Sequence, residues 1–412
     1  MTRIALIPSS YPPALGGVEE LTRHLALTLV AAGDEVEVWT CPADDSDRES
    51  VEIRDGLVVR RYPMHLPASS WSAVQRSLTS GTRTLLSLRR AVAAFRPDVL
   101  HVQCFGPNGA FATALARLTG VPLVVTLQGE TMMDDGDIFE ISKSLRAALR
   151  SGIKHAAVVT GCSAFTLSDA EKRFGLLAGR GQVIWNGVDL SQGASNPDGS
   201  PASDLGLTGA EPRPYILALG RVVEKKGFDL LLAAYAAMEP SERTAELVIA
   251  GAGGSLEHLK QAAVDLGVED RVHFPGRLSR EDVARAMADS ELFIVPSRLE
   301  PFGIVILEGW RAGVTVVATT HGGPPEFVHD GKDGVLVDPF DTSAFASSLA
   351  QLLADPNRRS SIAAAGRARV QSFAWPAIAE QYRLIYATLG SRSSKAEGKE
   401  PGGTAKSKEA VA

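Results

Sequence analysis

The sequence is poor in cysteine, in net positive charge and in long apolar runs. Its three cysteines, Cys41, Cys104 and Cys162, lie far apart and show no metal-ligand spacing. They form no disulfide framework, so we expect a protein of a reducing, cytoplasmic compartment. The net charge of −6 argues against nucleic-acid binding, because a phosphate backbone calls for a basic surface. No run of about 18 apolar residues could span a bilayer, and the first residues predict a strand rather than a signal peptide.

The chain does contain a repeated alternation of short apolar strands and helical patterns. At 412 residues it exceeds one ordinary hydrophobic core, and the alternation predicts an α/β protein with doubly wound parallel sheets. We place the domains at residues 1–190 and 215–372, joined by a Gly-, Ser- and Pro-rich linker at 191–214. A last helical pattern covers 373–389. The tail, 391–412, has almost no large apolar residue and is predicted to be disordered.

The stretch Glu300-Pro-Phe-Gly-Ile-Val-Ile-Leu-Glu308 carries the strongest functional signal. It leads from an apolar strand pattern at 291–297 into a helix, and a helix N-terminus offers free backbone amides to a phosphate. Gly303 has no Cβ, so a phosphate can approach the backbone closely. Glu300 and Glu308 flank this cradle and suit a ligand with hydroxyls at both ends, such as a nucleotide sugar. On these residues alone, an ordinary turn with two solvated carboxylates fits equally well.

A basic loop follows the first strand of the second domain. Arg221 and Lys226 lie between a strand pattern at 215–220 and a helical pattern at 228–238, where open parallel sheets bind ligands. Two cations there could neutralise a diphosphate and stabilise it as it leaves. A basic loop taken alone is more often simply solvated.

Gly16 and Gly17 form a second candidate phosphate site. They close the loop between the first strand and the first helix, so their amides could face donor phosphates across an interdomain cleft. The alternative is a flexible turn, with Glu19 and Glu20 favouring the helix N-terminus.

Together these motifs resemble the retaining glycosyltransferases of family 4, which have the GT-B fold. The resemblance rests on Gly220-Arg-x4-Lys-Gly227 followed by Pro296-Ser-x-x-Glu-Pro-Phe-Gly-x4-Glu308. Four shorter segments support it: Val272–Gly276, Gly322–Glu326, Gly331–Gly334 and Asn186–Asp189. It covers residues 3–388 and is specific for fold and donor class, but not for the acceptor.

The resemblance implies two Rossmann-like domains facing across a cleft, with the helix at 373–389 packed back on the first domain. It implies transfer of a sugar from a UDP- or GDP-linked donor to a hydroxyl acceptor, by a same-face mechanism without metal or cofactor. A glycan, a lipid-linked acceptor and a small molecule all remain open. Two other functions stay as alternatives: a GT-B epimerase or phosphorylase, and a catalytically silent protein that binds nucleotide sugar.

The resemblance also implies roles for single residues. Glu300, Lys226 and Arg221 are expected to act in catalysis, with Glu300 on the donor sugar hydroxyls and the two cations on the diphosphate. Glu308 is expected to bind the ribose diol. The nucleotide base is expected near Gly276 and Arg277. The other expected donor contacts are Gly16, Gly17, Gly303 and Ile304.

Gln128 marks a departure from the family pattern. Many relatives carry His-Gly where this chain has Gln128-Gly129, and glutamine can bond a sugar hydroxyl but cannot take a proton near pH 7. A same-face reaction tolerates this, because the departing phosphate oxygen can accept the acceptor's proton. Glu130 is expected to orient the acceptor, with an ordinary loop carboxylate as the alternative.

Asp135-Gly-Asp137 resembles the metal motif of another glycosyltransferase fold. However, these acidic residues precede a helix that carries Lys143 and Arg146 along one side. A helix dipole favours acidic residues at the N-terminus and basic residues further on, so we expect no metal there.

A basic amphipathic helix is predicted over residues 74–92. Arg76, Arg83 and Arg90 recur at seven-residue spacing opposite an apolar stripe, and residues 56–97 contain no Asp or Glu. Such a helix can lie on an anionic membrane, which would place the protein peripherally at the inner face, or attract an acidic acceptor. The alternative is that its apolar face packs on the sheet.

Overall fold

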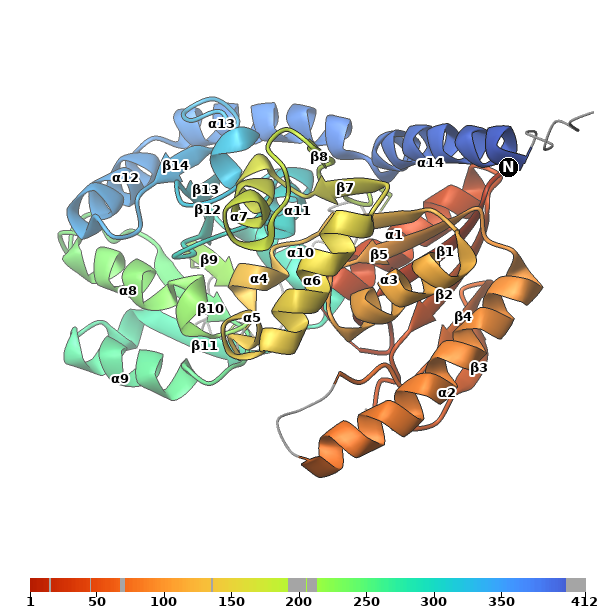
Figure 1. Cartoon of the computed structure of the whole chain (residues 1–412). Coiled ribbons are helices and arrows are strands. Elements are labelled where there is room, and N and C mark those ends of the chain that lie inside the picture. The colour runs from red at the N-terminus through yellow and green to blue at the C-terminus, as the bar shows by residue number, and fades with distance from the viewer. Residues whose placement is uncertain are drawn as a thin grey trace, which may run out of the picture.

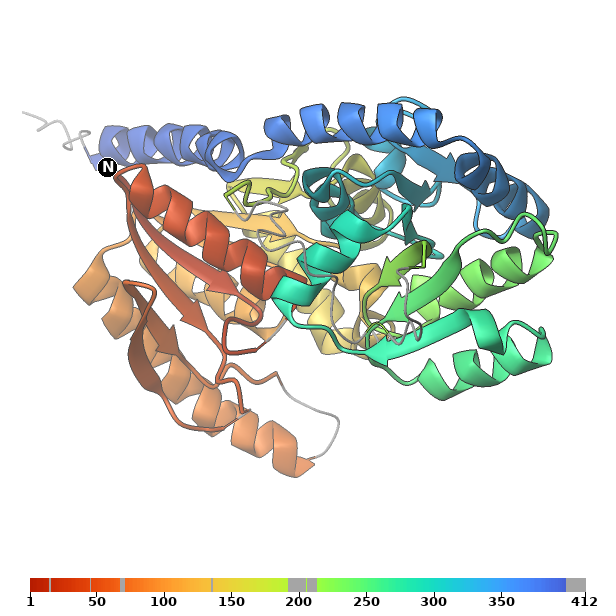
Figure 2. The ribbon, with the colours of Figure 1, turned by 180° about the vertical axis from the view of Figure 1, so that it is seen from behind.

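The computed structural model describes residues 1–14, 16–44, 46–66, 71–134, 136–191, 205 and 213–397, without the side chains of 71–79 and 391–397. The chain forms two sheets, one in each half, with helices on both faces of each (Figures 1 and 2). Segments 192–204 and 206–212 of the predicted linker and 398–412 of the predicted tail lie outside the described residues.

The N-terminal sheet has eight strands in the order β3-β4-β2-β1-β5-β6-β7-β8. All neighbours are parallel except β3 and β4, which form an antiparallel hairpin at one edge. The strands are β1 (Arg3–Pro8), β2 (Glu35–Thr40), β3 (Ser50–Arg54), β4 (Leu57–Arg61), β5 (Val99–Gln103), β6 (Leu123–Leu127), β7 (Val158–Gly161) and β8 (Gly181–Val183). The helices are α1 (Gly17–Ala31), α2 (Trp71–Phe95), α3 (Pro107–Thr119), α4 (Glu130–Met133), α5 (Ile138–Ile141), α6 (Lys143–His155) and α7 (Ala164–Phe174).

The C-terminal sheet has six parallel strands in the order β11-β10-β9-β12-β13-β14. They are β9 (Tyr215–Leu219), β10 (Glu246–Ala250), β11 (Val272–Gly276), β12 (Leu292–Val295), β13 (Val316–Thr319) and β14 (Val335–Val337). The helices are η1 (Glu224–Lys226), α8 (Phe228–Ala237), α9 (Leu256–Asp265), η2 (Glu269–Arg271), α10 (Arg280–Asp289), α11 (Ile304–Ala312), η3 (Pro324–Glu326), α12 (Thr342–Ala354), α13 (Pro356–Arg369), η4 (Val370–Phe373) and α14 (Trp375–Glu397).

The strand orders explain where a ligand can bind. In each sheet the first strand of the unit, β1 or β9, lies between the second strand and a later one, β5 or β12. The connections on its two sides therefore leave in opposite directions and open a crevice at the carboxyl ends of the strands. The loops that begin after β1, β9 and β12 carry the glycines, the cations and Glu300 singled out above, and Glu308 lies in the helix that follows β12. The two doubly wound sheets confirm the predicted α/β class.

The strands at the centre of each sheet are buried on both faces. Every residue of β5, β6 and β10 is buried, as expected for parallel strands covered by helices. Their largely apolar sequences made these strands predictable, although β5 also buries His101 and Gln103.

The β3–β4 hairpin was not predicted. Its turn is Asp55-Gly56, where φ is 51° and 78°. Positive φ at both turn residues is the signature of a tight hairpin turn, and Asp-Gly is one of its preferred sequences. That dipeptide was the available signal.

Helix α14 packs against the N-terminal half, although it follows the C-terminal sheet in the chain (Figures 1 and 2). Ile378, Tyr382 and Tyr386 are buried in one cluster with Ile4 of β1 and Leu25 of α1.

The predicted end of this helix at Leu389, with disorder from Ser391, was wrong: α14 continues to Glu397. The helix first crosses Gly390 and three serines, which are weak helix formers, so propagation from the packed part of α14 carries it to the stronger formers Lys395–Glu397.

The basic helix packs its apolar side on the protein. In α2, Leu88 and Ala91 are buried in the N-terminal core, while Arg83, Arg89 and Arg90 are exposed. The side chain of Arg76 lies outside the described residues. No helix in the described part of the chain is both long and apolar enough to cross a membrane.

Candidate functional site

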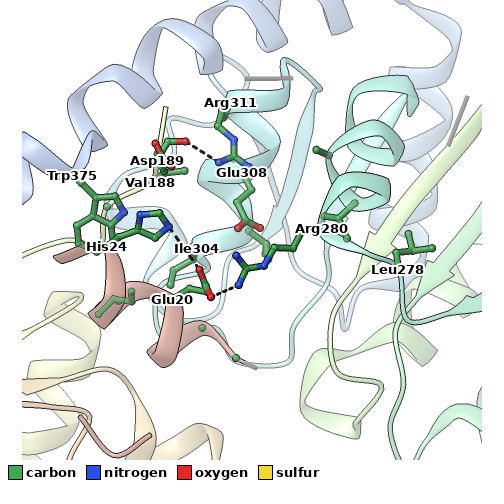
Figure 3. A pocket seen from close by; sticks show the side chains of 17 residues that line it. Glu20, His24, Val188, Asp189, Leu278, Arg280, Ile304, Glu308, Arg311 and Trp375 are labelled. Carbon is green, nitrogen blue, oxygen red and sulfur yellow. Dashed lines mark hydrogen bonds and ion pairs between the residues drawn. The ribbon is translucent and has the colours of Figure 1, made fainter. Parts of the chain in front are cut away.

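Two adjoining pockets lie between the halves of the molecule. The first, the Glu300 pocket, has a volume of about 290 Å³ and is lined by Gln128, Arg221, Lys226 and Glu300 among others. The second, the Glu308 pocket, has a volume of about 330 Å³ (Figure 3). Residues lining both are Gly17, Leu21, Ile304 and Val305, so the pockets meet where α1 and α11 approach each other.

The meeting point consists of two helix N-termini, one from each half. A Cβ added to Gly17 would lie 3.8 Å from Ile304 Cδ1, which shows how close α1 and α11 come. The N-cap residues of these helices are Gly16 and Gly303, which have no side chain to cap the first turn. Two sets of first-turn amides, each at the positive end of a helix dipole, therefore face the same space, which suits a diphosphate.

Glu300 is held firmly in its pocket. It is 5% exposed, and its Oε2 accepts hydrogen bonds from Lys226 Nζ at 2.7 Å and Ser297 Oγ at 2.8 Å. Its backbone is also clamped: Glu300 N donates to His321 O (3.0 Å), and Gly323 N donates to Glu300 O (2.8 Å). The pairing of Lys226 with Glu300 brings together two residues that the sequence predicted separately.

Gly322 shows why this clamp needs glycine. Its φ is 117°, and a Cβ there would lie 2.1 Å from the carbonyl oxygen of Glu300. Any side chain would push Glu300 out of place. The Gly322–Glu326 segment thus positions Glu300, a role that its match to the family motif did not reveal.

Glu308 is held loosely by comparison. It projects from α11 into its pocket between Arg280 and Arg311, and no hydrogen bond or ion pair of its side chain is present in the described structure (Figure 3). Burial raises the pKa of Glu308 above its ordinary value, while the nearby Arg311 lowers it. A half-buried carboxylate with open acceptor sites is suited to bind a pair of hydroxyls.

Other side chains join the two halves around Glu308. Arg280 of α10 forms an ion pair with Glu20 of α1, and His24 stacks on Trp375 with ring centroids 6.0 Å apart (Figure 3). Arg311 donates to Asp189 O at 2.9 Å.

The two residues expected near the base lie outside both pockets. Gly276 and Arg277 do not line them, and Arg277 is exposed, but the neighbouring Leu278 lines the Glu308 pocket. A base contact at Gly276 or Arg277 therefore stays a prediction.

The basic loop after β9 also binds the N-terminal half. Lys225 Nζ donates to Met132 O (3.1 Å), Asp134 O (2.6 Å) and Asp137 Oδ1 (2.8 Å), and Arg221 Nη2 lies 3.4 Å from Met133 O. Lys225 was not predicted.

One carboxylate of the Asp135-Gly-Asp137 motif is paired with a lysine. Asp137 is paired with Lys225, while Asp135 lies outside the described residues. Among the residues that are described, no group of three His, Cys, Asp or Glu side chains is arranged to hold a metal ion.

Glu326 is a further link that the sequence did not reveal. From η3 of the C-terminal half, its carboxylate accepts hydrogen bonds from Ala164 N and Phe165 N, both at 2.7 Å. These are first-turn amides of α7, so Glu326 caps a helix of the other half.

Glu130 lines neither pocket. Its carboxylate accepts hydrogen bonds from Phe105 N and Gln128 N, both at 2.6 Å, and so ties together the segments that follow β5 and β6. Burial raises the pKa of Glu130 to about 7, against the lowering effect of these two amides. The predicted contact with an acceptor remains untested, and the observed contacts support the loop.

Comparison with known proteins gives the family. The chain matches Glycosyltransferase Family 4 over residues 15–192 and Glycosyl transferases group 1 over residues 207–369. A D-inositol 3-phosphate glycosyltransferase of Frankia alni is 30% identical over 88% of this chain and 92% of its own. A GDP-mannose-dependent alpha-(1-6)-phosphatidylinositol monomannoside mannosyltransferase of Mycolicibacterium smegmatis is 29% identical over the same shares.

Solved structures agree in fold. A sucrose-phosphate synthase from Thermosynechococcus elongatus has a TM-score of 0.75 at 23% identity, covering 95% of this chain and 100% of that one. Anabaena HepE in complex with UDP and glucose has a TM-score of 0.72 at 22% identity, covering 94% and 100%. The two sheets facing across a cleft are thus the GT-B fold, as predicted. The chain belongs to glycosyltransferase family 4 and is a glycosyltransferase.

Proposed function

We propose that the enzyme transfers a sugar from a nucleotide-diphosphate sugar to a hydroxyl acceptor, with retention of configuration and without a metal. The carrying observation is the meeting of two uncapped helix N-termini between the Glu300 and Glu308 pockets. An elongated donor fits this arrangement: the nucleoside beside Glu308, the diphosphate at the two helix ends, and the sugar beside Glu300 and Gln128.

Cations from one loop take the place of a metal. Lys226 is held at the Glu300 pocket by its ion pair, so a phosphate oxygen bound there would share the ammonium group with Glu300. Arg221 lines the same pocket and adds a second positive charge. Charges fixed before the reaction stabilise the departing nucleoside diphosphate without the cost of reorganising solvent.

What supports retention is the lining of the Glu300 pocket, which among the described residues holds no histidine and no carboxylate other than Glu300, itself paired with Lys226. Gln128 cannot take a proton near pH 7, and Glu130 faces backbone amides. An inverting reaction needs a base on the face opposite the leaving group, whereas a same-face reaction can use the departing phosphate oxygen. The same-face mechanism is therefore the one we propose.

The relatives narrow the choice of donor. One is named as GDP-mannose-dependent, and structures of HepE contain UDP or UDP-glucose, so we propose a UDP- or GDP-linked hexose. Relatives named for inositol phosphate and for a phosphatidylinositol mannoside favour a polar acceptor, either free or lipid-linked.

A lipid-linked acceptor would agree with peripheral membrane contact through α2. Its exposed arginines lie beside Leu86, which is 47% exposed, so the helix offers both charge and apolar surface. The cytoplasmic location and the contact with the inner face of the membrane remain predictions.

The test is a panel of UDP- and GDP-linked sugars, scored by release of UDP or GDP in the presence of EDTA. We expect release from one donor without added metal, and a product whose anomeric proton coupling, read by NMR, shows retention. A large diaxial coupling from an α-gluco-type donor would show inversion. Epimerised donor would favour the epimerase, and strict dependence on phosphate would favour the phosphorylase. Binding of the donor without turnover would favour the silent binding protein.

A further inference from the structure

A chain of buried polar side chains runs from α14 to the Glu300 pocket. It begins at Tyr386, whose Oη lies 2.6 Å from His101 Nδ1 on β5. Gln103, two residues along the same strand, places its Nε2 3.1 Å from His101 Nε2. Tyr386 is 1% exposed and the other two are fully buried, so this segment is closed to water.

The chain continues to the surface of the pocket. Gln128 Nε2 donates to Gln103 Oε1 at 3.1 Å, and Asn186 Nδ2 donates to Gln128 Oε1 at 2.9 Å. Gln128 and Asn186 both line the Glu300 pocket, whereas Gln103 and His101 do not. The Gln128 amide is therefore bonded on both sides before any substrate arrives.

The chain has a direction. From Asn186 onward, the amide nitrogen of each residue meets the oxygen of the next, and Gln103 Nε2 finally meets the ring nitrogen of His101. Rotating the Gln128 amide alone would set its nitrogen against the Asn186 nitrogen and its oxygen against the Gln103 oxygen. Two repulsive contacts would replace two hydrogen bonds. Leaving buried polar groups unsatisfied in this way has a large cost in free energy.

His101 closes the far end of the chain, and one of its neutral tautomers matches this direction. Burial lowers the pKa of His101 to about 3, so the ring is neutral and carries one proton. With Gln103 donating to Nε2, that proton is on Nδ1 and faces Tyr386 Oη. Two threonines continue the hydrogen bonding beside His101. Thr126 Oγ1 lies 2.7 Å from His101 Nε2, and Thr160 Oγ1 lies 2.6 Å from Thr126 Oγ1.

We propose that Asn186 and Gln103 are positioning residues that fix the amide of Gln128, so that it offers the substrate sugar one donor–acceptor pattern. The inference rests on the proposed function, because it takes the Glu300 pocket as the sugar site. A solvated glutamine can turn its amide to suit either kind of hydroxyl contact. A glutamine bonded on both sides cannot, and a site built for one hydroxyl arrangement rejects sugars that lack it.

The test is a double-mutant cycle between Asn186→Asp and Gln128→Leu. Aspartate keeps the shape of asparagine but replaces the Nδ2 donor with an oxygen. The hydrogen bond to Gln128 Oε1 is therefore lost. We expect about a tenfold lower kcat for UDP or GDP release from UDP-glucose or GDP-mannose, with a smaller change in KM, as for the loss of one oriented hydrogen bond. In the Gln128→Leu background the same substitution should change kcat less than twofold (about 0.4 kcal/mol), because its effect passes through Gln128.

Asn108→Asp is a matched control. Asn108 is also fully buried in the N-terminal half, but its amide donates only to backbone, at Ile7 O (2.8 Å) and Cys104 O (3.2 Å). Any effect of Asn108→Asp should therefore add fully to that of Gln128→Leu. Thermal unfolding of each variant separates loss of fold from loss of position. If Asn186→Asp does not fold, Gln103→Leu takes its place in the cycle, since it removes the acceptor for Gln128 Nε2 and should likewise act on kcat only through Gln128.

The outcomes are distinct. Non-additivity for Asn186→Asp with additivity for Asn108→Asp supports the inference. If the wild type is active and the effect of Asn186→Asp adds fully to that of Gln128→Leu, the inference alone is overturned. The same follows if kcat is unchanged in the folded Asn186→Asp variant or in its replacement at Gln103. A wild type that releases no nucleotide from any donor overturns the proposed function, and the inference with it.

Discussion

Glu300 and Glu308 bracket the N-terminus of α11, yet the structure holds them in opposite ways. Glu300 is nearly fully buried, accepts two side-chain hydrogen bonds and has its backbone clamped beside Gly322. Glu308 lies on the helix with no side-chain partner in the described structure and with a raised pKa. One carboxylate is fixed before the donor binds, and the other offers free acceptor sites.

This difference matches two different tasks. An interaction that must strengthen as charge develops at the anomeric carbon benefits from a group that is already oriented. A contact with a ribose diol is made equally in ground and transition states, so it needs only an accessible acceptor. We therefore expect damage at the Glu300 end to lower turnover and damage at the Glu308 end to weaken donor affinity.

The largest effect is expected for Lys226→Ala. It removes the cation that pairs with Glu300 and would hold the diphosphate, costing about 3 kcal/mol or roughly a hundredfold in kcat. Activity of the wild type should persist in EDTA. Lys225→Ala is the matched control, because it takes an ammonium from the same loop without touching Glu300 and should cost less. Strict dependence on magnesium or manganese would contradict this prediction and direct attention back to Asp135 and Asp137.

Glu300→Gln and Glu308→Gln test the comparison directly. Losing a hydrogen bond from a charged group costs about 1.5–3 kcal/mol, so changes of roughly tenfold or more are expected in each. For Glu300→Gln we expect them in kcat, and for Glu308→Gln in the KM for the donor, read from steady-state kinetics. Equal effects on the same constant would abolish the distinction, and normal kinetics in both would favour the ordinary-turn interpretation.

Ser297→Ala should give a smaller version of the Glu300 effect. It removes the second donor to Glu300 Oε2 but leaves Lys226 in place, so kcat should fall about fivefold, as for a typical hydrogen bond of about 1 kcal/mol. Donor KM should stay near the wild-type value. If KM rises while kcat is unchanged, Ser297 acts on the donor and not on the orientation of Glu300.

The smallest effect is the pH dependence due to Glu308. Because its folded pKa is raised, Glu308 loses its charge at a higher pH than an ordinary glutamate, so donor KM should rise as pH falls through that raised value. Its contribution to stability has the opposite sign: it is present below the unfolded pKa and lost as pH rises through the folded one. In Glu308→Gln, donor KM should no longer depend on pH in this range. Persistence of the same dependence would assign it to another group.

Several parts of the site follow from local sequence. Arg221, Lys226, Gly16, Gly17 and Gly303 were predicted at strand-to-helix loops, because apolar strands and the glycines that end them are readable at short range. In a doubly wound sheet such loops necessarily gather at the carboxyl edge, so strand order alone brings them together. The family motifs then indicated the GT-B fold and the donor class.

Partners that depend on packing could not be read this way. Lys225 bonds a segment 88–93 residues earlier in the chain, and Glu326 caps α7 from 161–162 residues away. No local pattern marks such pairs, because they exist only once the two halves have docked. The same holds for the bonds of Glu130 to two backbone amides, whereas its contact with an acceptor stays a prediction.

By itself, the sequence determined which loops carry charge, which carry glycine, and that two parallel sheets would present them at one edge. Only the tertiary structure decided that Glu300 would be clamped and paired while Glu308 has no side-chain partner among the described residues. It also decided that Gln128 would be bonded between Gln103 and Asn186. The physical reason is that amphipathic periodicity and turn chemistry act over a few residues. The orientation of a buried polar group is set instead by hydrogen-bond partners that distant strands and helices bring within 3 Å or so of it.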